Sequence, residues 1–173
     1  MFCGNVLAES KDKNIRLNQL FEQLKKSNNA SLAFEIEMKI WNIWTTHPTH
    51  YNLTQSLAKG SELISKGELD KAYKIFSTII ESDPAWAEGW NKRATVLYLM
   101  GRYQESLEDI DEVLKHESRH FGALSGQGLV QTALENYEKA IKSYEAVQKI
   151  YPSIKSAEVM IPQLKKLIKD NAI

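Results

Sequence analysis

The residues of this chain that could do chemistry are few, and they are scattered. Of the four histidines, His47 and His50 lie close together, and His116 and His120 are four apart. Two histidines at that spacing on one helix face suit a metal ion, but a turn is expected between His116 and His120. We therefore expect solvated turn histidines and no metal site.

Other catalytic patterns are equally weak. Cys3 is the single cysteine, so it cannot form an internal disulfide, and nothing near it in the sequence lowers its pKa. The glycine-rich run 122–128 has no lysine after its last glycine, so it is not a phosphate-binding loop. An acidic cluster is expected on a solvated helix face: Glu105, Glu108, Asp109, Asp111 and Glu112. The sequence predicts a protein that is not an enzyme and holds no cofactor.

Length and charge narrow the function classes. The chain has 173 residues, of which 43% are hydrophobic and 25% charged, which is the composition of about one globular domain. Its 22 basic and 22 acidic residues balance, so the positive charge that nucleic-acid binding requires is missing. The apolar runs are much shorter than the roughly 20 residues that cross a bilayer, so we expect no membrane insertion.

The first residues leave two alternatives open. Residues 1–8 are mainly apolar and end in Val6-Leu7-Ala8, which resembles a signal-peptidase site. A complete signal peptide needs a basic leading region and a longer apolar stretch. We therefore expect residues 1–13 to be a disordered leader or the remnant of a signal peptide. The protein would be periplasmic or secreted in the second case and cytoplasmic otherwise.

An internal period of 34 residues organises most of the chain. Residues of the same kind recur at this spacing without a gap, which defines three units at 53–86, 87–120 and 121–154. The best series are Phe76, Ile110 and Tyr144; Gly60, Ala94 and Gly128; and Ala72, Ser106 and Ala140. A fixed period of this length indicates a stack of repeated helical units.

Each unit has the pattern of two antiparallel helices. The first half carries a small residue where a neighbouring helix can approach closely, and the second half carries an amphipathic stripe. Gly67 and Gly101 separate the halves and can end the first helix in a left-handed conformation. In the third unit we expect Asn136 to do this.

The pattern resembles the tetratricopeptide repeat (TPR), whose form is W-x₂-L-G-x₂-Y, A-x₃-F and P over 34 residues. The matching residues are Trp90, Gly60, Gly128, Ala72 with Phe76, Ala140 with Tyr144, and Pro84 with Pro152. Lys59, Arg93 and Gln127 replace the usual leucine, and Ser118 the usual proline. The resemblance implies an all-α fold, a right-handed superhelix of helical hairpins called an α-solenoid.

The ends of such an array need caps with a polar outer face. Residues 14–52 are expected to form an N-terminal helical hairpin, a divergent repeat or cap, with a linker. Trp41 and Trp44 would seal the first regular repeat. Residues 155–173 are expected to form a capping helix with Val159, Leu164, Leu167 and Ile168 on its apolar side, kinked or restarted at Pro162.

The resemblance also implies where a partner would bind. In TPR arrays the first helices line a concave groove, and the corresponding positions here include Leu57, Ser61, Ile64, Asn91, Thr95, Tyr98, Leu99, Ser125 and Leu129. Relatives that clamp an acidic peptide terminus use lysine and asparagine at the fifth and ninth positions of the repeats, and only Asn91 fits. We expect Asn91 to orient a bound backbone.

Two functions remain at this stage. The first is a non-enzymatic protein-interaction module that binds a peptide segment or helix of another protein in this groove, with a monomer favoured. The alternative is a self-associating assembly protein in which apolar ends, or Trp86 and Trp90, meet across a dimer.

Overall fold

The computed structural model describes residues 3–170, and side chains within residues 12–170. The described residues form helices only, so the predicted all-α fold of stacked helical hairpins is confirmed. The helices are α1 (Cys3–Lys26), α2 (Ala30–Thr45), α3 (Tyr51–Ser65), α4 (Leu69–Ser82), α5 (Ala87–Leu99), α6 (Tyr103–His116), α7 (Phe121–Ala133), α8 (Tyr137–Ile150) and α9 (Lys155–Asp170). Within these residues, no helix has the length and apolar character that crossing a bilayer requires.

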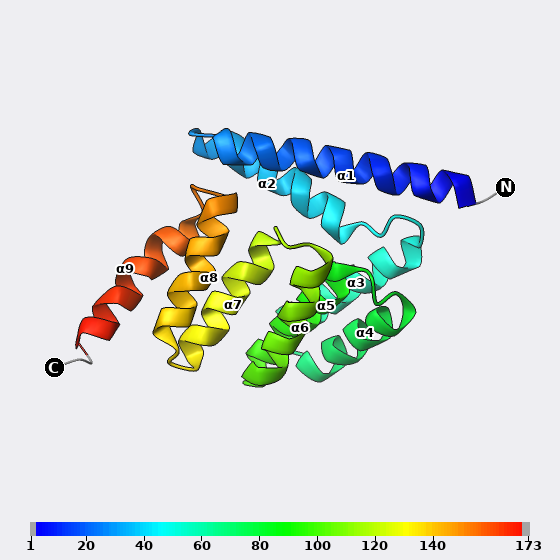
Figure 1. The fold of residues 1–173 in the computed structure, drawn as a ribbon. Helices are drawn as coiled ribbons and strands as arrows, with labels where there is room; N and C mark the ends of the chain where they lie inside the picture. Colours follow the sequence, from blue (N-terminus) through cyan, green and yellow to red (C-terminus); the bar gives the residue numbers. More distant parts are fainter. Residues whose placement is uncertain (1–2, 171–173) are drawn as a thin grey trace.

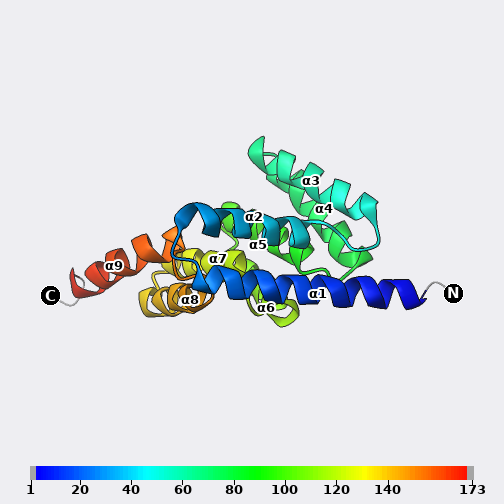
Figure 2. The same cartoon turned by 90° about the horizontal axis from the view of Figure 1, so that it is seen from above.

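Three hairpins, α3–α4, α5–α6 and α7–α8, stack in chain order, and α9 extends the stack (Figure 1). Seen from above, α5 and α7 lie on one side of the stack and α6 and α8 on the other (Figure 2). We call the face formed by the first helices α3, α5 and α7 the inner face. The helices α1 and α2 run across the ends of α5 to α8.

The small residues of the repeat set how closely the two helices of a hairpin approach. A Cβ atom added at Gly60 would lie 2.5 Å from the ring of Phe76, and one at Gly128 would lie 2.6 Å from that of Tyr144. Both aromatic rings are completely buried. The glycines therefore leave the space that the largest core residue of each hairpin fills.

The turn between the two helices has a left-handed residue at the same position in each repeat, but in the third repeat this residue is not the predicted one. Gly67 and Gly101 adopt positive φ angles of 72° and 74°. In the third repeat the left-handed residue is Glu135, with φ 58°, and not Asn136 as predicted from its side chain. Glu135 is exactly one period after Gly101, so the register of the turn determines the conformation even where the residue type opposes it.

Polar pairs replace the usual leucine contact in two repeats. The Arg93 guanidinium donates two hydrogen bonds of 2.8 Å to the carboxylate of Asp109, and Ser143 donates one of 2.8 Å to the amide oxygen of Gln127. Asp109 is buried, so the expectation that the whole acidic cluster is solvated is wrong for this residue. It is buried because it is paired across the hairpin.

The N-terminal leader also differs from the expectation. Helix α1 begins at Cys3, so residues 3–13 are helical and not a disordered leader. Once the apolar stripe Leu17, Leu20, Phe21 and Leu24 is packed, extending the helix adds a hydrogen bond for each residue, and the segment contains no proline. Residues 1–2 lie outside the described residues, so the signal-peptide alternative for residues 1–8 stays a prediction.

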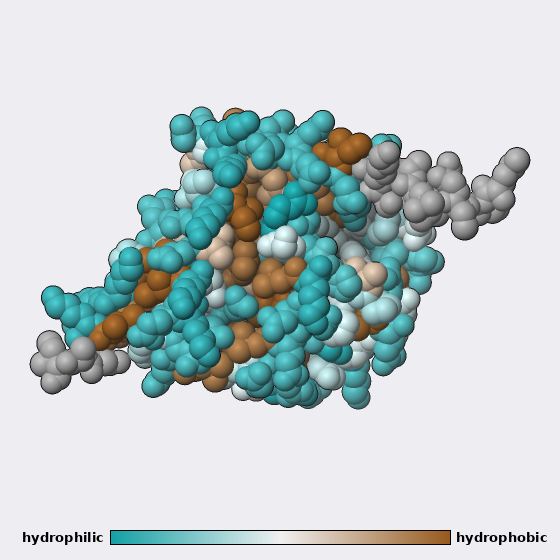
Figure 3. All heavy atoms as spheres, viewed as in Figure 1, coloured by the Kyte–Doolittle hydropathy of each residue, from teal (hydrophilic) through white to brown (hydrophobic). Residues whose placement is uncertain are grey.

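The last helix covers the end of the array only in part. Helix α9 is continuous through Pro162 and does not restart there. Ala157 and Leu164 are fully buried, whereas Val159 and Leu167 are 50% and 41% exposed, contrary to the expectation that they face the core. Figure 3 shows an apolar stripe along α9. Residues 171–173 lie outside the described residues.

Candidate functional site

The tryptophan rings of the N-terminal hairpin pack at the start of α7, and the Trp86 indole of the first repeat donates a hydrogen bond to the Trp44 carbonyl. The Trp44 indole stacks on the imidazole of His120, with ring centroids 4.0 Å apart, and lies 4.9 Å from the ring of Phe121. Trp41 contacts the same phenyl ring edge to face at 5.3 Å. The prediction that these tryptophans seal the first repeat is therefore wrong, although Trp44 is buried in the core as expected.

His120 is part of a buried polar group under this contact. It is fully buried, where a solvated turn histidine was expected. Its Nδ1 accepts the backbone N–H of Ala123 at the start of α7, so Nε2 carries the proton and donates to Glu88, 3.1 Å away. Burial raises the pKa of Glu88, but the hydrogen bonds from His120 and Asn91 and the nearby charge of Lys92 outweigh it, and the pKa of Glu88 lies below its ordinary value.

His47 plays the same structural part in the linker before α3. It is buried, not solvated as expected, and its Nδ1 accepts the backbone N–H groups of Thr49 and His50 while Nε2 lies 2.8 Å from Asp83. His120 thus caps the start of α7, and His47 holds the turn that precedes α3. Among residues 12–170 no three His, Cys, Asp or Glu side chains are grouped so as to hold a metal ion.

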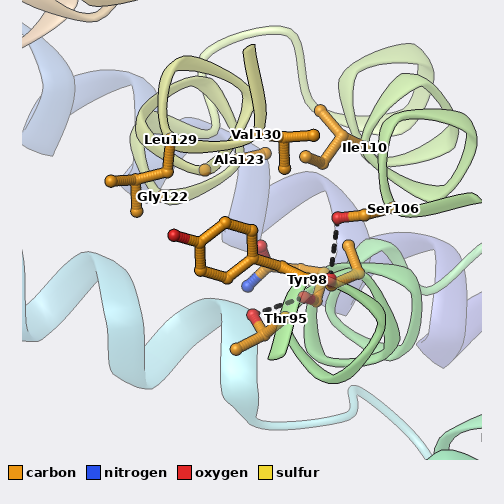
Figure 4. Close-up of a pocket in the computed structure, with 11 residues that line it drawn as sticks. Thr95, Tyr98, Ser106, Ile110, Gly122, Ala123, Leu129 and Val130 are labelled. Carbon is orange, nitrogen blue, oxygen red and sulfur yellow. Dashed lines mark hydrogen bonds between the residues drawn. The ribbon is translucent and has the colours of Figure 1, made fainter. Parts of the chain in front are cut away.

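A recess of about 80 Å³ opens on the inner face between α5, α6 and α7. Its residues are Asn91, Ala94, Thr95, Tyr98, Ser106, Ile110, Gly122, Ala123, Gly126, Leu129 and Val130, and we call it the Tyr98 recess. Figure 4 shows the Tyr98 ring directed from α5 toward Gly122 and Leu129 of α7. The recess is half the size of cavities of about 150 Å³ that bind benzene, so it suits an aliphatic side chain.

Three of the polar side chains around the recess, those of Asn91, Thr95 and Ser106, are engaged within the chain. Thr95 donates its hydroxyl to the carbonyl of Asn91 at 3.0 Å, and Ser106 donates to that of Ala94 at 2.8 Å, both drawn in Figure 4. The Asn91 amide donates to Glu88 at 3.1 Å. The surface left for a ligand is therefore mainly apolar.

The structure brings together some of the sequence-predicted site residues. Asn91, Thr95, Tyr98 and Leu129 line the Tyr98 recess. Thr95 and Leu129 are exposed, as is Leu99 at the end of α5, whereas Tyr98 is half-buried. Ser125 lies on α7, and its hydroxyl is 3.1 Å from that of Ser156 on α9.

The residues predicted on α3 do not line a ligand site, and the role predicted for Asn91 does not fit its surroundings. Leu57 is buried in the core beside Phe76, Ile64 packs partly against the same cluster, and the Ser61 hydroxyl donates to the Leu57 carbonyl. Asn91 is only 8% exposed. Its amide group is held by Glu88, so the expectation that it orients a ligand as a surface residue is revised.

A second pocket, which lies beside α2, was not predicted from the sequence. This pocket, of about 480 Å³, lies between α2, α7 and the start of α9. We call it the Phe34 pocket after one of its α2 residues. The sequence does carry a signal for it, since Phe34, Met38 and Trp41 repeat at helical spacing.

The comparisons with known proteins agree with this architecture. The tetratricopeptide repeat family model matches residues 91–153. A TPR repeat-containing protein of Rhizobium etli is 33% identical over 96% of this chain and 83% of its own length. The DnaJ homolog subfamily C member 7 homolog of Schizosaccharomyces pombe is 27% identical over 65% of this chain, which spans only 25% of that protein.

Solved structures with the same fold include domains bound to peptides. The first TPR of Spaghetti (RPAP3), bound to the HSP90 peptide SRMEEVD, has a TM-score of 0.65 at 20% identity and covers 68% of this chain and 93% of its own. The TPR2B domain of yeast Sti1 in a complex with pHsp70 has a TM-score of 0.64 at 16% identity, covering 68% and 99%.

Proposed function

Since the chain belongs to the tetratricopeptide repeat family, we propose that it is a non-enzymatic interaction module that holds a peptide segment or a helix of another protein against its inner face. The observation that carries this proposal is the Tyr98 recess. It is open, it lies between two repeats, and it combines an aromatic ring with small residues, Ala94, Ala123 and Gly126, that leave room for a side chain.

The chemistry of the recess supports an uncharged ligand segment. The peptide in the first TPR of Spaghetti (RPAP3) ends in EEVD. Here the Asn91 amide is already engaged by Glu88, and among the described residues no lysine or arginine lines the recess to pair with a carboxylate. A partner with aliphatic side chains at the contact therefore fits this chain better than an acidic terminus.

The proposal includes no catalytic step. A catalytic base needs a nitrogen or oxygen that can reach a substrate proton. His47 and His120 are buried and bonded to carboxylates and to backbone N–H groups, and neither lines the Tyr98 recess.

The test uses peptides selected from a phage-displayed random library on the purified protein. The affinity of the selected peptide is then measured by calorimetry for the wild type, Thr95→Ala and Tyr98→Ala. Because Thr95 is exposed and Tyr98 half-buried, these variants should fold. The matched control is the pair Glu108→Gln and Glu112→Gln on α6.

We expect Tyr98→Ala to raise the Kd at least about fivefold, as a central aromatic contact does, and the α6 pair to leave it unchanged. Thr95→Ala, which removes a hydroxyl bonded to its own helix, should have a smaller effect. Binding that depends on the α6 pair and is indifferent to Tyr98 would place the site on the opposite face and end the proposal.

A second candidate function is self-association through α9. The specific observation is its exposed apolar stripe, which includes Val159 and Leu167. Two copies could bury these stripes against each other. Sedimentation velocity over a range of concentrations decides, because a monomer throughout, or a dimer unaffected by Val159→Ser with Leu167→Ser, excludes this role.

A further inference from the structure

Helix α2 has two apolar faces, and only one of them is used within the chain. Its buried residues are Ala33, Ile36, Ile40, Ile43 and Trp44. A second stripe runs through Phe34, Met38 and Trp41 at i, i+4 and i+7, and we call it the outer stripe of α2. Phe34 is 59% and Met38 51% exposed. A helix that is apolar around most of its circumference is normally covered on both sides.

The outer stripe borders the inner face of the array. Phe34 and Trp41 line the Phe34 pocket together with Ser125 of α7 and Tyr151, which follows α8. Gly122 lines both this pocket and the Tyr98 recess, so the two adjoin on α7. The two therefore lie side by side along α7, the recess toward α5 and the pocket toward α2.

A single glycine makes this junction possible. A Cβ atom added at Gly122 would lie 2.5 Å from the Trp41 ring. The indole therefore rests directly on the backbone of α7. Any larger residue at this position would push α2 away from α7.

The charged groups of the Phe34 pocket have partners within the chain. The Glu37 carboxylate accepts the indole N–H of Trp41 at 3.2 Å and the Tyr151 hydroxyl at 3.1 Å. Lys155 is 2.7 Å from Glu158. Apart from Glu37 and Lys155, the Phe34 pocket is lined by aromatic, aliphatic and small residues, among them Phe34, Trp41 and Ile154. Such a surface is complementary to uncharged apolar side chains and unfavourable for a carboxylate near Glu37.

We infer that α2 is the second wall of the binding groove. The occupant is a segment of another protein that places one aliphatic side chain in the Tyr98 recess and a second apolar side chain in the Phe34 pocket, with no acidic residue at either. This inference rests on the proposed function and deepens it, because it assigns half of the contact to a hairpin outside the repeats. It also accounts for the exposure of Phe34.

The test compares two exposed residues of the same helix. Phe34→Ser removes a ring of the Phe34 pocket, and Leu32→Ser is the matched control, because Leu32 is 49% exposed and lies outside the pocket. The probe is the peptide selected from the random library, and its Kd is measured by calorimetry. Circular dichroism melts verify that both variants fold.

We expect Phe34→Ser to raise the Kd at least about fivefold, and Leu32→Ser to leave it within about twofold. The selected sequences should share two apolar positions without Asp or Glu at either. If Phe34→Ser binds like the wild type while Tyr98→Ala does not, the inference about α2 fails and the proposed function stands. If neither Phe34→Ser nor Tyr98→Ala changes the Kd, the inference about α2 and the proposed function both fail.

Two further outcomes would also overturn the inference. The first is a selected consensus with an acidic terminus. The second is a wild-type dimer that Phe34→Ser converts to a monomer in sedimentation velocity, which would make the outer stripe of α2 a contact between copies of this chain.

Discussion

The imidazole of His120 stacks on the indole of Trp44, with ring centroids 4.0 Å apart and an angle of 11° between the planes. Trp44 belongs to α2 of the N-terminal hairpin, and His120 is the residue that caps the start of α7. The indole N–H of Trp86 adds a hydrogen bond of 2.9 Å to the Trp44 carbonyl. The hairpin and the array therefore share one core at this point, and α2 is held where it can border the inner face.

Removing this contact should destabilise the whole protein. Trp44→Ala is expected to lower the free energy of unfolding by about 3–5 kcal/mol, because a buried aromatic side chain leaves a cavity. Trp44→Phe keeps a ring against His120 and should cost less. Urea denaturation monitored by circular dichroism measures both. Equal stability of the wild type and Trp44→Ala would show that the hairpin is not part of the cooperative fold.

Acid should weaken the same region through Glu88. Its pKa is lowered in the folded state, so its contribution to stability is present above the pKa of the unfolded chain, about 4.3, and is lost as the pH falls through the folded value. At neutral pH, Glu88→Gln should cost about 1–3 kcal/mol, because it removes a buried hydrogen bond to a charged group. The difference between the two proteins should shrink in acid. A difference that stays constant from pH 7 to about pH 3 contradicts this.

The turn of the third repeat offers a stabilising substitution. Glu135 has a φ of 58°, a conformation that costs a residue with a side chain about 1 kcal/mol relative to glycine. Glu135→Gly should therefore raise the thermal midpoint. The reverse change at the equivalent position, Gly101→Glu, should lower it. Thermal melts of both variants provide the comparison, and a loss of stability in Glu135→Gly would be the opposite of the expected result.

Core and end positions should differ strongly. Phe76 is fully buried and Ile110 is 3% exposed, so replacing either by alanine should cost about 2–5 kcal/mol. Val159 is half exposed, and Val159→Ala should change stability by about 0.5 kcal/mol or less. The midpoints of urea unfolding, compared at the same dependence of the unfolding free energy on urea concentration, test this prediction. Similar losses of unfolding free energy at all three positions would rule it out.

The repeats were predictable because each position is specified several times. The period of 34 residues places Phe76, Ile110 and Tyr144 in equivalent sites, and all three are buried. The same register explains Glu135, which adopts the glycine conformation although its residue type does not favour it. Periodicity thus predicted the helices and the core. At Glu135, the position in the repeat predicts the backbone conformation and the residue type does not.

The site was harder to predict because it depends on contacts between distant segments. Nothing local indicates that His120 and Glu88 form a buried pair, or that Trp41 rests on Gly122. The inner-face positions predicted Thr95, Tyr98 and Leu129 as lining residues, but not that Leu57 belongs to the core or that the Asn91 amide is engaged. The position of α2 follows from the packing of Trp41 and Trp44 against His120 and Phe121, which a repeat pattern does not encode.

The most direct test of the central claim is where a bound peptide lies. In ¹H–¹⁵N spectra, glycine amides report on separate places: Gly122 and Gly126 line the Tyr98 recess, whereas Gly67 and Gly101 lie in the turns between paired helices. On titration with the library-selected peptide, the signals of Gly122 and Gly126 should shift and those of Gly67 and Gly101 should not. Shifts confined to Gly67 and Gly101 would contradict binding at the inner face.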